Sequence, residues 1–239
     1  KSMAAFARAS QLKPQNSELR TKLAMSRMAT GDADKAMSDL ESIAAGDANA
    51  FQADIILALA HINKKEWKQA DTVVARLAKK QPDSPLPGSL NASILLGKND
   101  APGARKELEK VLQKHPGFVP AAVNLARLDL SEKKPEQAQK RFDSLLAKEE
   151  KNVDLMMAYA EFLLAIEKPA DAQPWLEKAH QIQPDAVQPA LALTSLALSN
   201  GDNKRALGIA QESLAKKPDN PQLLDNLAKV QLAAGDQNQ

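Results

Sequence analysis

The sequence contains no cysteine and very few aromatic residues. Without cysteine, disulfide bonds, thiolate catalysis and zinc–thiolate sites are excluded, although the cellular compartment stays open. Phe, Trp and Tyr together make up 3% of the chain, and Ala and Leu supply most of its 44% of apolar residues. This composition favours helices packed through small side chains over a sheet core, which needs β-branched and aromatic residues.

Neither sign of charge dominates, and no long hydrophobic run occurs. The balance of 32 Lys and Arg against 30 Asp and Glu gives no electrostatic case for a nucleic-acid partner. The longest apolar run, IILALA at 55–60, is far shorter than the ~18 residues of a membrane span. The first residues, KSMAAFARAS, lack the long apolar stretch and cleavage site of a signal peptide. We therefore expect any export signal or lipid anchor to lie outside this sequence.

The sequence does contain a period of 34 residues. Alanines recur at this spacing without a slip: Ala36, Ala70, Ala104, Ala138, Ala172 and Ala206. A larger apolar residue follows most of them four positions later, as Phe142 follows Ala138, and proline recurs near the end of the unit, as at Pro82 and Pro116. We expect each alanine to be buried where two helices approach closely, and Gln139, beside Ala138, to be exposed.

Each unit has the pattern of two helices joined by a turn. The first helix covers about thirteen residues, as in AAVNLARLDLSE at 121–132, with apolar residues at helical spacing. Residues that tolerate the left-handed conformation stand at the turn in four units: Gly31, Asn99, Gly201 and Gly235. Elsewhere a proline such as Pro135 opens the second helix. Pro174 falls inside a second helix and predicts a late start or a kink there.

This pattern resembles the tetratricopeptide repeat (TPR), a 34-residue helix–turn–helix unit with small residues in fixed columns and a terminal proline. The resemblance covers the whole chain and implies an all-α fold, an α-α superhelix (TPR solenoid) of stacked antiparallel helix pairs. We expect a single TPR array over 1–239 that is a piece of a longer one, because it begins and ends within a repeat. Full repeats are placed at 17–50, 51–84, 85–118, 119–152, 153–186 and 187–220, with partial repeats at 1–16 and 221–239.

Residues with catalytic or metal-binding chemistry form no recognisable motif. His61, His115 and His180 fall in different repeats without ligand-like spacing, and neither a G-x-S-x-G elbow nor a phosphate-binding loop occurs. We therefore expect no catalytic residue, no cofactor and no metal. The rival interpretation, a glycan-active enzyme, would need two carboxylates in one site. Asp129 and Glu161 are the nearest candidates, and the sequence gives no reason for them to converge.

The candidate functional surface is the concave groove that the first helices line in this family. The family's geometry places the fifth and ninth positions of each repeat in that groove. These positions, with one neighbour, give the candidate ligand-binding residues Met25, Ile55, Leu59, Ser89, Ser93, Asn124, Arg127, Met157 and Glu161. Co-chaperones of this family grip a terminal carboxylate with Lys and Asn in these columns, so Thr21 and Met25 in the first full repeat argue against that class. The alternative is that such residues only pack against neighbouring helices.

Two stretches carry a narrower resemblance, GFVPAAVNLARLDLSEKKPEQAQKRFDSLL at 117–146 and LKPQNSELRTKLAMSRMATGD at 12–32. They look like the TPR-repeat lipoproteins of bacterial PEP-CTERM/exosortase systems, which sit beside exopolysaccharide gene clusters. The resemblance implies a non-catalytic scaffold that binds protein or peptide segments in exopolysaccharide export or surface-protein sorting. The implied location is the periplasmic side of a Gram-negative envelope, with a cytoplasmic location still open. The alternative is a periplasmic TPR segment that docks a polysaccharide synthase to an outer-membrane pore.

Overall fold

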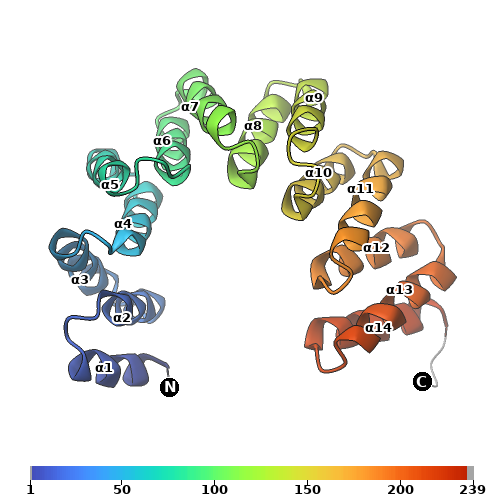
Figure 1. The fold of residues 1–239 in the computed structure, drawn as a ribbon, viewed down its shortest axis with the longest axis horizontal. Helices are drawn as coiled ribbons and strands as arrows, with labels where there is room; N and C mark the ends of the chain where they lie inside the picture. The colour runs from blue at the N-terminus through green and yellow to red at the C-terminus, as the bar shows by residue number, and fades with distance from the viewer. Residues whose placement is uncertain (1, 236–239) are drawn as a thin grey trace. The chain divides into compact units, whose positions relative to one another are not determined.

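The computed structural model describes residues 2–235, which form fourteen α-helices and no strand (Figure 1). The expected all-α fold is thereby confirmed. In chain order the helices are α1 Ser2–Leu12, α2 Ser17–Ala29, α3 Ala33–Gly46, α4 Phe51–Asn63, α5 Trp67–Lys80, α6 Leu86–Gly97, α7 Ala101–Lys114, α8 Val119–Ser131, α9 Pro135–Leu146, α10 Val153–Ala165, α11 Pro169–Ile182, α12 Val187–Ser199, α13 Asn203–Lys216 and α14 Pro221–Ala233.

The chain divides into two compact units, Lys1–His115 and Pro116–Gln239. In the N-terminal unit α2 packs on α3, α4 on α5 and α6 on α7. In the C-terminal unit α8 packs on α9, α10 on α11 and α12 on α13, and α14 follows. Some first helices also contact the first helix of the next pair: α4 contacts α6, α8 contacts α10, and α12 contacts α14. We call the surface that these first helices form in each unit its first-helix face.

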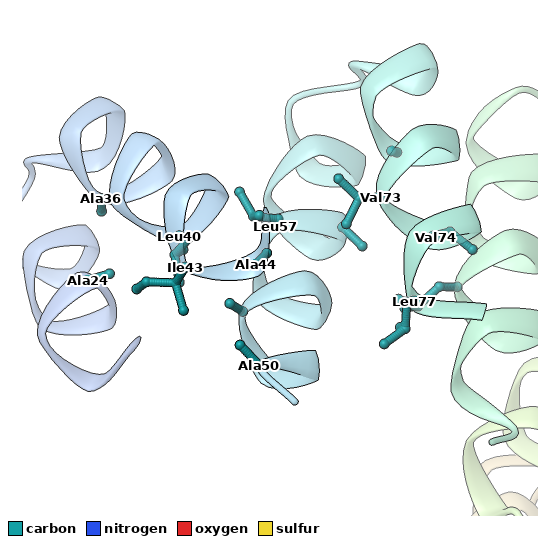
Figure 2. Packing of buried hydrophobic residues seen from close by; sticks show 14 of the residues in the cluster. Ala24, Ala36, Leu40, Ile43, Ala44, Ala50, Leu57, Val73, Val74 and Leu77 are labelled. Carbon is teal, nitrogen blue, oxygen red and sulfur yellow. The ribbon is translucent and has the colours of Figure 1, made fainter. Parts of the chain in front are cut away.

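Alanine allows the two helices of a pair to approach closely. The six alanines at the 34-residue spacing are all fully buried, as predicted: Ala36, Ala70, Ala104, Ala138, Ala172 and Ala206. Figure 2 shows the N-terminal core, in which Ala24 of α2, Leu40 of α3 and Leu57 of α4 belong to one cluster. The expectation for Gln139 is wrong, because it is half-buried and accepts a hydrogen bond from Lys168 Nζ at 2.9 Å.

The turn inside each repeat has one repeated backbone conformation. A residue with positive φ occurs there every 34 positions: Gly31, Lys65, Asn99, Lys133, Glu167, Gly201 and Gly235. At the second of these turns the Lys65 N–H donates to the Ile62 carbonyl at 3.0 Å, and the Glu66 N–H donates to the His61 carbonyl at 2.9 Å. These two bonds are the Schellman arrangement, which satisfies the last carbonyls of a helix. The glycine and asparagine positions confirm the prediction, whereas the two lysines and the glutamate were not expected to take this conformation.

Pro174 does not delay its helix. α11 begins at Pro169 and runs through Pro174 to Ile182. Pro169 occupies the first helical position, where its fixed φ favours helix initiation and its missing N–H costs nothing. The late start is therefore wrong, and a kink at Pro174 stays a prediction.

Candidate functional site

Two of the predicted groove positions in the N-terminal unit carry large, exposed apolar side chains. Met25 on α2 is 44% exposed and Leu59 on α4 is 46% exposed. Each follows a fully buried alanine, Ala24 or Ala58, by one residue, which corresponds to about 100° around the helix. The same local sequence thus buries the small residue against the second helix and turns the larger one to solvent. Ile55, one turn before Leu59, is half-buried and packs on the core.

Most hydroxyl groups on the first-helix face of this unit form hydrogen bonds to carbonyl groups of their own helices. Thr21 is 2% exposed, and its hydroxyl donates to the Ser17 carbonyl at 2.7 Å. On α6, Ser89 is 8% exposed and Ser93 is half-buried, with the Ser93 hydroxyl donating to the Ser89 carbonyl at 3.1 Å. Since buried hydroxyls already have partners, these positions offer little to a charged ligand group.

In the C-terminal unit, Arg127 on α8 and Glu161 on α10 are exposed and line the same pocket of about 200 Å³. The apolar part of its lining comes from three helices of the unit and includes Val123, Ala126, Leu130, Phe142, Ala158 and Phe162. The Phe142 and Phe162 rings lie 5.6 Å apart between centroids. Asn124 and Met157 are half-buried and do not line this pocket. The structure thus brings together two of the predicted site residues.

Sequence reasoning did not foresee this pocket. The available signal was the concentration of Phe142, Tyr159, Phe162 and Trp175 in two repeats of a chain that is poor in aromatic residues. The Phe142 and Tyr159 rings stack with centroids 4.8 Å apart, and burial raises the pKa of the Tyr159 hydroxyl to about 12. Two of the four rings, Phe142 and Phe162, line the pocket beside Ala126, Ala158 and Ala165.

Asp129 and Glu161 do not form a catalytic carboxylate pair. Asp129 is fully buried, and its carboxylate lies 3.2 Å from the Arg141 guanidinium of α9. Glu161 is exposed in the pocket that Arg127 lines. Because Asp129 is buried and ion-paired while Glu161 is exposed in a pocket that Asp129 does not line, these two groups lack the arrangement of an acid and a base around one bond.

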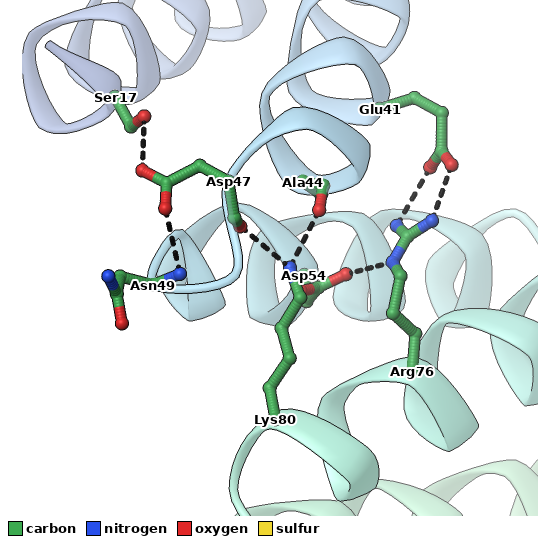
Figure 3. Close-up of polar contacts among 8 residues, drawn as sticks. All are labelled: Ser17, Glu41, Ala44, Asp47, Asn49, Asp54, Arg76 and Lys80. Atoms are coloured by element: carbon green, nitrogen blue, oxygen red, sulfur yellow. Dashed lines mark hydrogen bonds and ion pairs between the residues drawn. The ribbon is translucent and has the colours of Figure 1, made fainter.

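A second buried carboxylate, Asp54, lies in a polar network of the N-terminal unit (Figure 3). Arg76 Nε lies 2.5 Å and Lys80 Nζ 2.8 Å from its two oxygens. Arg76 also donates to both carboxylate oxygens of Glu41 at 2.5 and 2.9 Å, and this bonding lowers the pKa of Glu41. Lys80 Nζ donates to the carbonyl of Ala44 at 2.6 Å, near the end of α3. The buried charge of Asp54 thus has two cationic partners on α5, and the network links α3, α4 and α5, which gives it a structural role.

The histidines remain separate from one another and from clusters of acids. His61 Nδ1 lies 2.6 Å from a carboxylate oxygen of Glu66, across the turn that follows α4. In residues 2–235, no three His, Asp or Glu side chains gather in a way that could hold a metal ion. None of the described helices is both long enough and apolar enough to cross a membrane.

The family model of the tetratricopeptide repeat matches residues 27–94, 95–152 and 129–195, which is more than half of the chain. The chain belongs to the tetratricopeptide repeat family. TPR proteins are generally non-catalytic scaffolds, and TPR domains bind protein partners. This chain is therefore a TPR scaffold suited to protein–protein interaction.

Solved TPR structures share this fold at low sequence identity. Yeast Tom70 superimposes with a TM-score of 0.61 and 17% identity, covering 98% of this chain and 58% of Tom70. The human IFIT1 dimer with PPP-AAAA superimposes with a TM-score of 0.58 and 18% identity, covering 98% of this chain and 59% of the IFIT1 chain. A TPR protein from Parabacteroides merdae superimposes with a TM-score of 0.54 and 15% identity, covering 95% of this chain and 90% of the other. This chain thus spans less than two thirds of the Tom70 and IFIT1 chains, and such likeness shows the fold alone. A comparison with curated proteins finds no match.

Proposed function

We propose that this TPR chain binds segments of partner proteins along its first-helix face and performs no catalysis of its own. The observation that supports this most is the pair of exposed apolar side chains, Met25 and Leu59, at the ninth position of consecutive repeats. Covering a Leu or Met side chain contributes about 1.5–3 kcal/mol, so two such residues supply a useful part of a moderate affinity. Methionine is unbranched and adapts to different shapes, which suits a surface that meets several sequences.

The wider setting that we propose is exopolysaccharide export or PEP-CTERM surface-protein sorting, on the periplasmic side of a Gram-negative envelope. Its support is the sequence resemblance of 117–146 and 12–32 to TPR lipoproteins of those systems. Fractionation of cells that express the full-length gene tests the location. Recovery of the product in the periplasmic or membrane fraction supports the proposal, whereas recovery in the cytoplasm alone contradicts it.

The binding face can be tested by placing a charge on it. Leu59→Asp introduces a carboxylate in the middle of the apolar surface, where a bound segment would have to desolvate it. We expect at least a tenfold weaker interaction with partners recovered from an envelope extract, measured by titration of each purified partner. Ala75→Asp, at an exposed site on α5, adds the same charge to a second helix and should leave the affinity unchanged.

Lys140→Glu provides the corresponding control in the C-terminal unit, because Lys140 is exposed on the second helix α9. Circular dichroism and thermal unfolding of each variant show whether the fold is retained. If the Ala75 or Lys140 variant loses the partner while Leu59→Asp keeps it, the partner binds the second helices and the proposal is wrong.

A further inference from the structure

The pocket between α8 and α10 has the size of a site for one side chain. Its volume is about 200 Å³, below the roughly 300–1,000 Å³ that is usual for small-molecule sites. Phe142 of α9 and Phe162 of α10 contribute to an apolar lining, and the small side chains of Ala126 and Ala158 leave the space open. A medium-sized apolar side chain such as leucine therefore suits the pocket better than a cofactor or a sugar.

The two charged side chains beside this pocket, Arg127 and Glu161, have no bonding partner within the described residues. Across residues 2–235, neither the Arg127 guanidinium nor the Glu161 carboxylate takes part in a hydrogen bond or an ion pair. The other two described arginines of this unit do have partners, Arg141 with Asp129 and Arg205 with Glu177. One positive and one negative charge thus flank an apolar pocket and are free to meet complementary groups of a ligand.

We propose that this pocket receives a leucine-like side chain of an extended partner segment, with an acidic residue facing Arg127 and a basic residue facing Glu161. The proposal rests on the proposed function, because it assigns a sequence preference to part of the first-helix face. It predicts a motif in which the apolar residue stands between two residues of opposite charge.

The spacing of the helices fits such a motif. α8 and α10 are in contact, and axes of packed helices lie about 8–10 Å apart. In an extended segment alternate side chains share a face, and each residue adds about 3.3 Å. Charged residues two positions before and two positions after the apolar residue are then about 13 Å apart. The long side chains of Arg127 and Glu161 can cover the small difference.

The test uses acetylated, amidated heptapeptides and the full chain. The probes are SESLSKS and SKSLSES, which carry mixed charges in both orders, and SESLSES and SKSLSKS, which carry one sign. We expect the wild type to prefer a mixed peptide by about fivefold over either single-sign peptide, the ratio expected for exposed ion pairs. Arg127→Glu, which leaves two acidic groups at the pocket, should prefer SKSLSKS. Glu161→Arg, which leaves two basic groups, should prefer SESLSES.

A third variant tests the pocket itself. Ala165 is exposed at the end of α10 and lines the pocket, so Ala165→Trp should fill it and weaken the preferred peptide at least fivefold without unfolding the chain. Replacing the peptide's leucine by serine should have a similar effect on the wild type.

The results test the side-chain pocket separately from the broader proposal that partners bind the first-helix face. If the peptides bind but the Arg127 and Glu161 variants keep the wild-type preference, the charge assignment is overturned while binding to the first-helix face stands. If no peptide binds any of the proteins at millimolar concentration, the side-chain pocket is overturned, and the Leu59→Asp titration still decides the broader function.

Discussion

Lys65 and Lys64 are adjacent lysines at the end of α4, and glycine should have opposite effects at the two positions. Lys65 has a φ of 58°, a left-handed conformation that costs an ordinary residue about 1–2 kcal/mol. Glycine removes this cost but loses roughly 0.5–1 kcal/mol more conformational entropy on folding. Lys65→Gly should therefore stabilise the chain by about 0.5–1 kcal/mol.

Lys64 is the matched control, because its φ of −79° is favourable for any residue. Glycine relieves nothing there, so Lys64→Gly should destabilise by about 0.5–1 kcal/mol. The exposed ion pair of Lys64 with Asp34, at 3.3 Å, adds little to this loss. Both lysines are exposed, so burial does not differ between the two variants.

Thermal unfolding followed by far-UV circular dichroism measures the difference. For a chain of this size, 1 kcal/mol corresponds to about 2–4 °C in Tm, so Lys65→Gly should melt above the wild type and Lys64→Gly below it. A shift of the same sign for both variants would refute the assignment of the left-handed residue to Lys65.

Two further perturbations address packing and charge. Ala138→Leu should destabilise the chain by about 1–3 kcal/mol, because it overpacks a fully buried contact. Lys140→Leu, on the exposed side of α9, should change the midpoint of chemical denaturation very little. Equal shifts of the two midpoints would contradict the repeat register. The pKa of Glu41 is lowered by its bond to Arg76, and that of Glu177 is lowered by its arginine partner. The stability from these groups is present above the unfolded pKa of 4.5 and is lost as pH falls through the lower folded values. The free energy of unfolding should therefore decrease below about pH 4.5, less steeply for Glu41→Gln, and a flat profile in that range would contradict the pairing.

The regular part of the fold could be predicted because it depends on one repeated contact. An alanine that recurs every 34 residues without a slip, as at Ala104 and Ala138, fixes where the two helices of a pair touch. The turn was only partly predictable, because glycine favours a positive φ whereas residues such as Lys133 and Glu167 do not. There the periodic position of the backbone overrides the preference of the residue, and the 34-residue spacing from Asn99 and Gly201 was the available signal.

The candidate site was less predictable, because pockets and ion pairs depend on the sizes and directions of several side chains. The position of Glu161 on a first helix followed from the repeat, but its shared pocket with Arg127 depends on Phe142 and Phe162 lying beside alanines. Asp54 is the one acidic residue of the largely apolar helix α4. Its pairing with Arg76 could not be foreseen, because side-chain directions on a neighbouring helix are not encoded in a local pattern.

The network around Asp54 also has a consequence for folding cooperativity. Arg76 and Lys80 belong to the same repeat as Asp54, and they also bond to Glu41 and Ala44 of the preceding repeat, so these cross-repeat bonds exist only while both repeats are folded. Stability of a repeat array is approximately a sum of terms for single repeats and for nearest-neighbour interfaces. A strong interface term at this point makes separate opening of α3 or α5 unfavourable. In amide hydrogen exchange, the helices from α2 to α5 should then behave as one unit with a common opening free energy, and not as a series that frays helix by helix from the N-terminus.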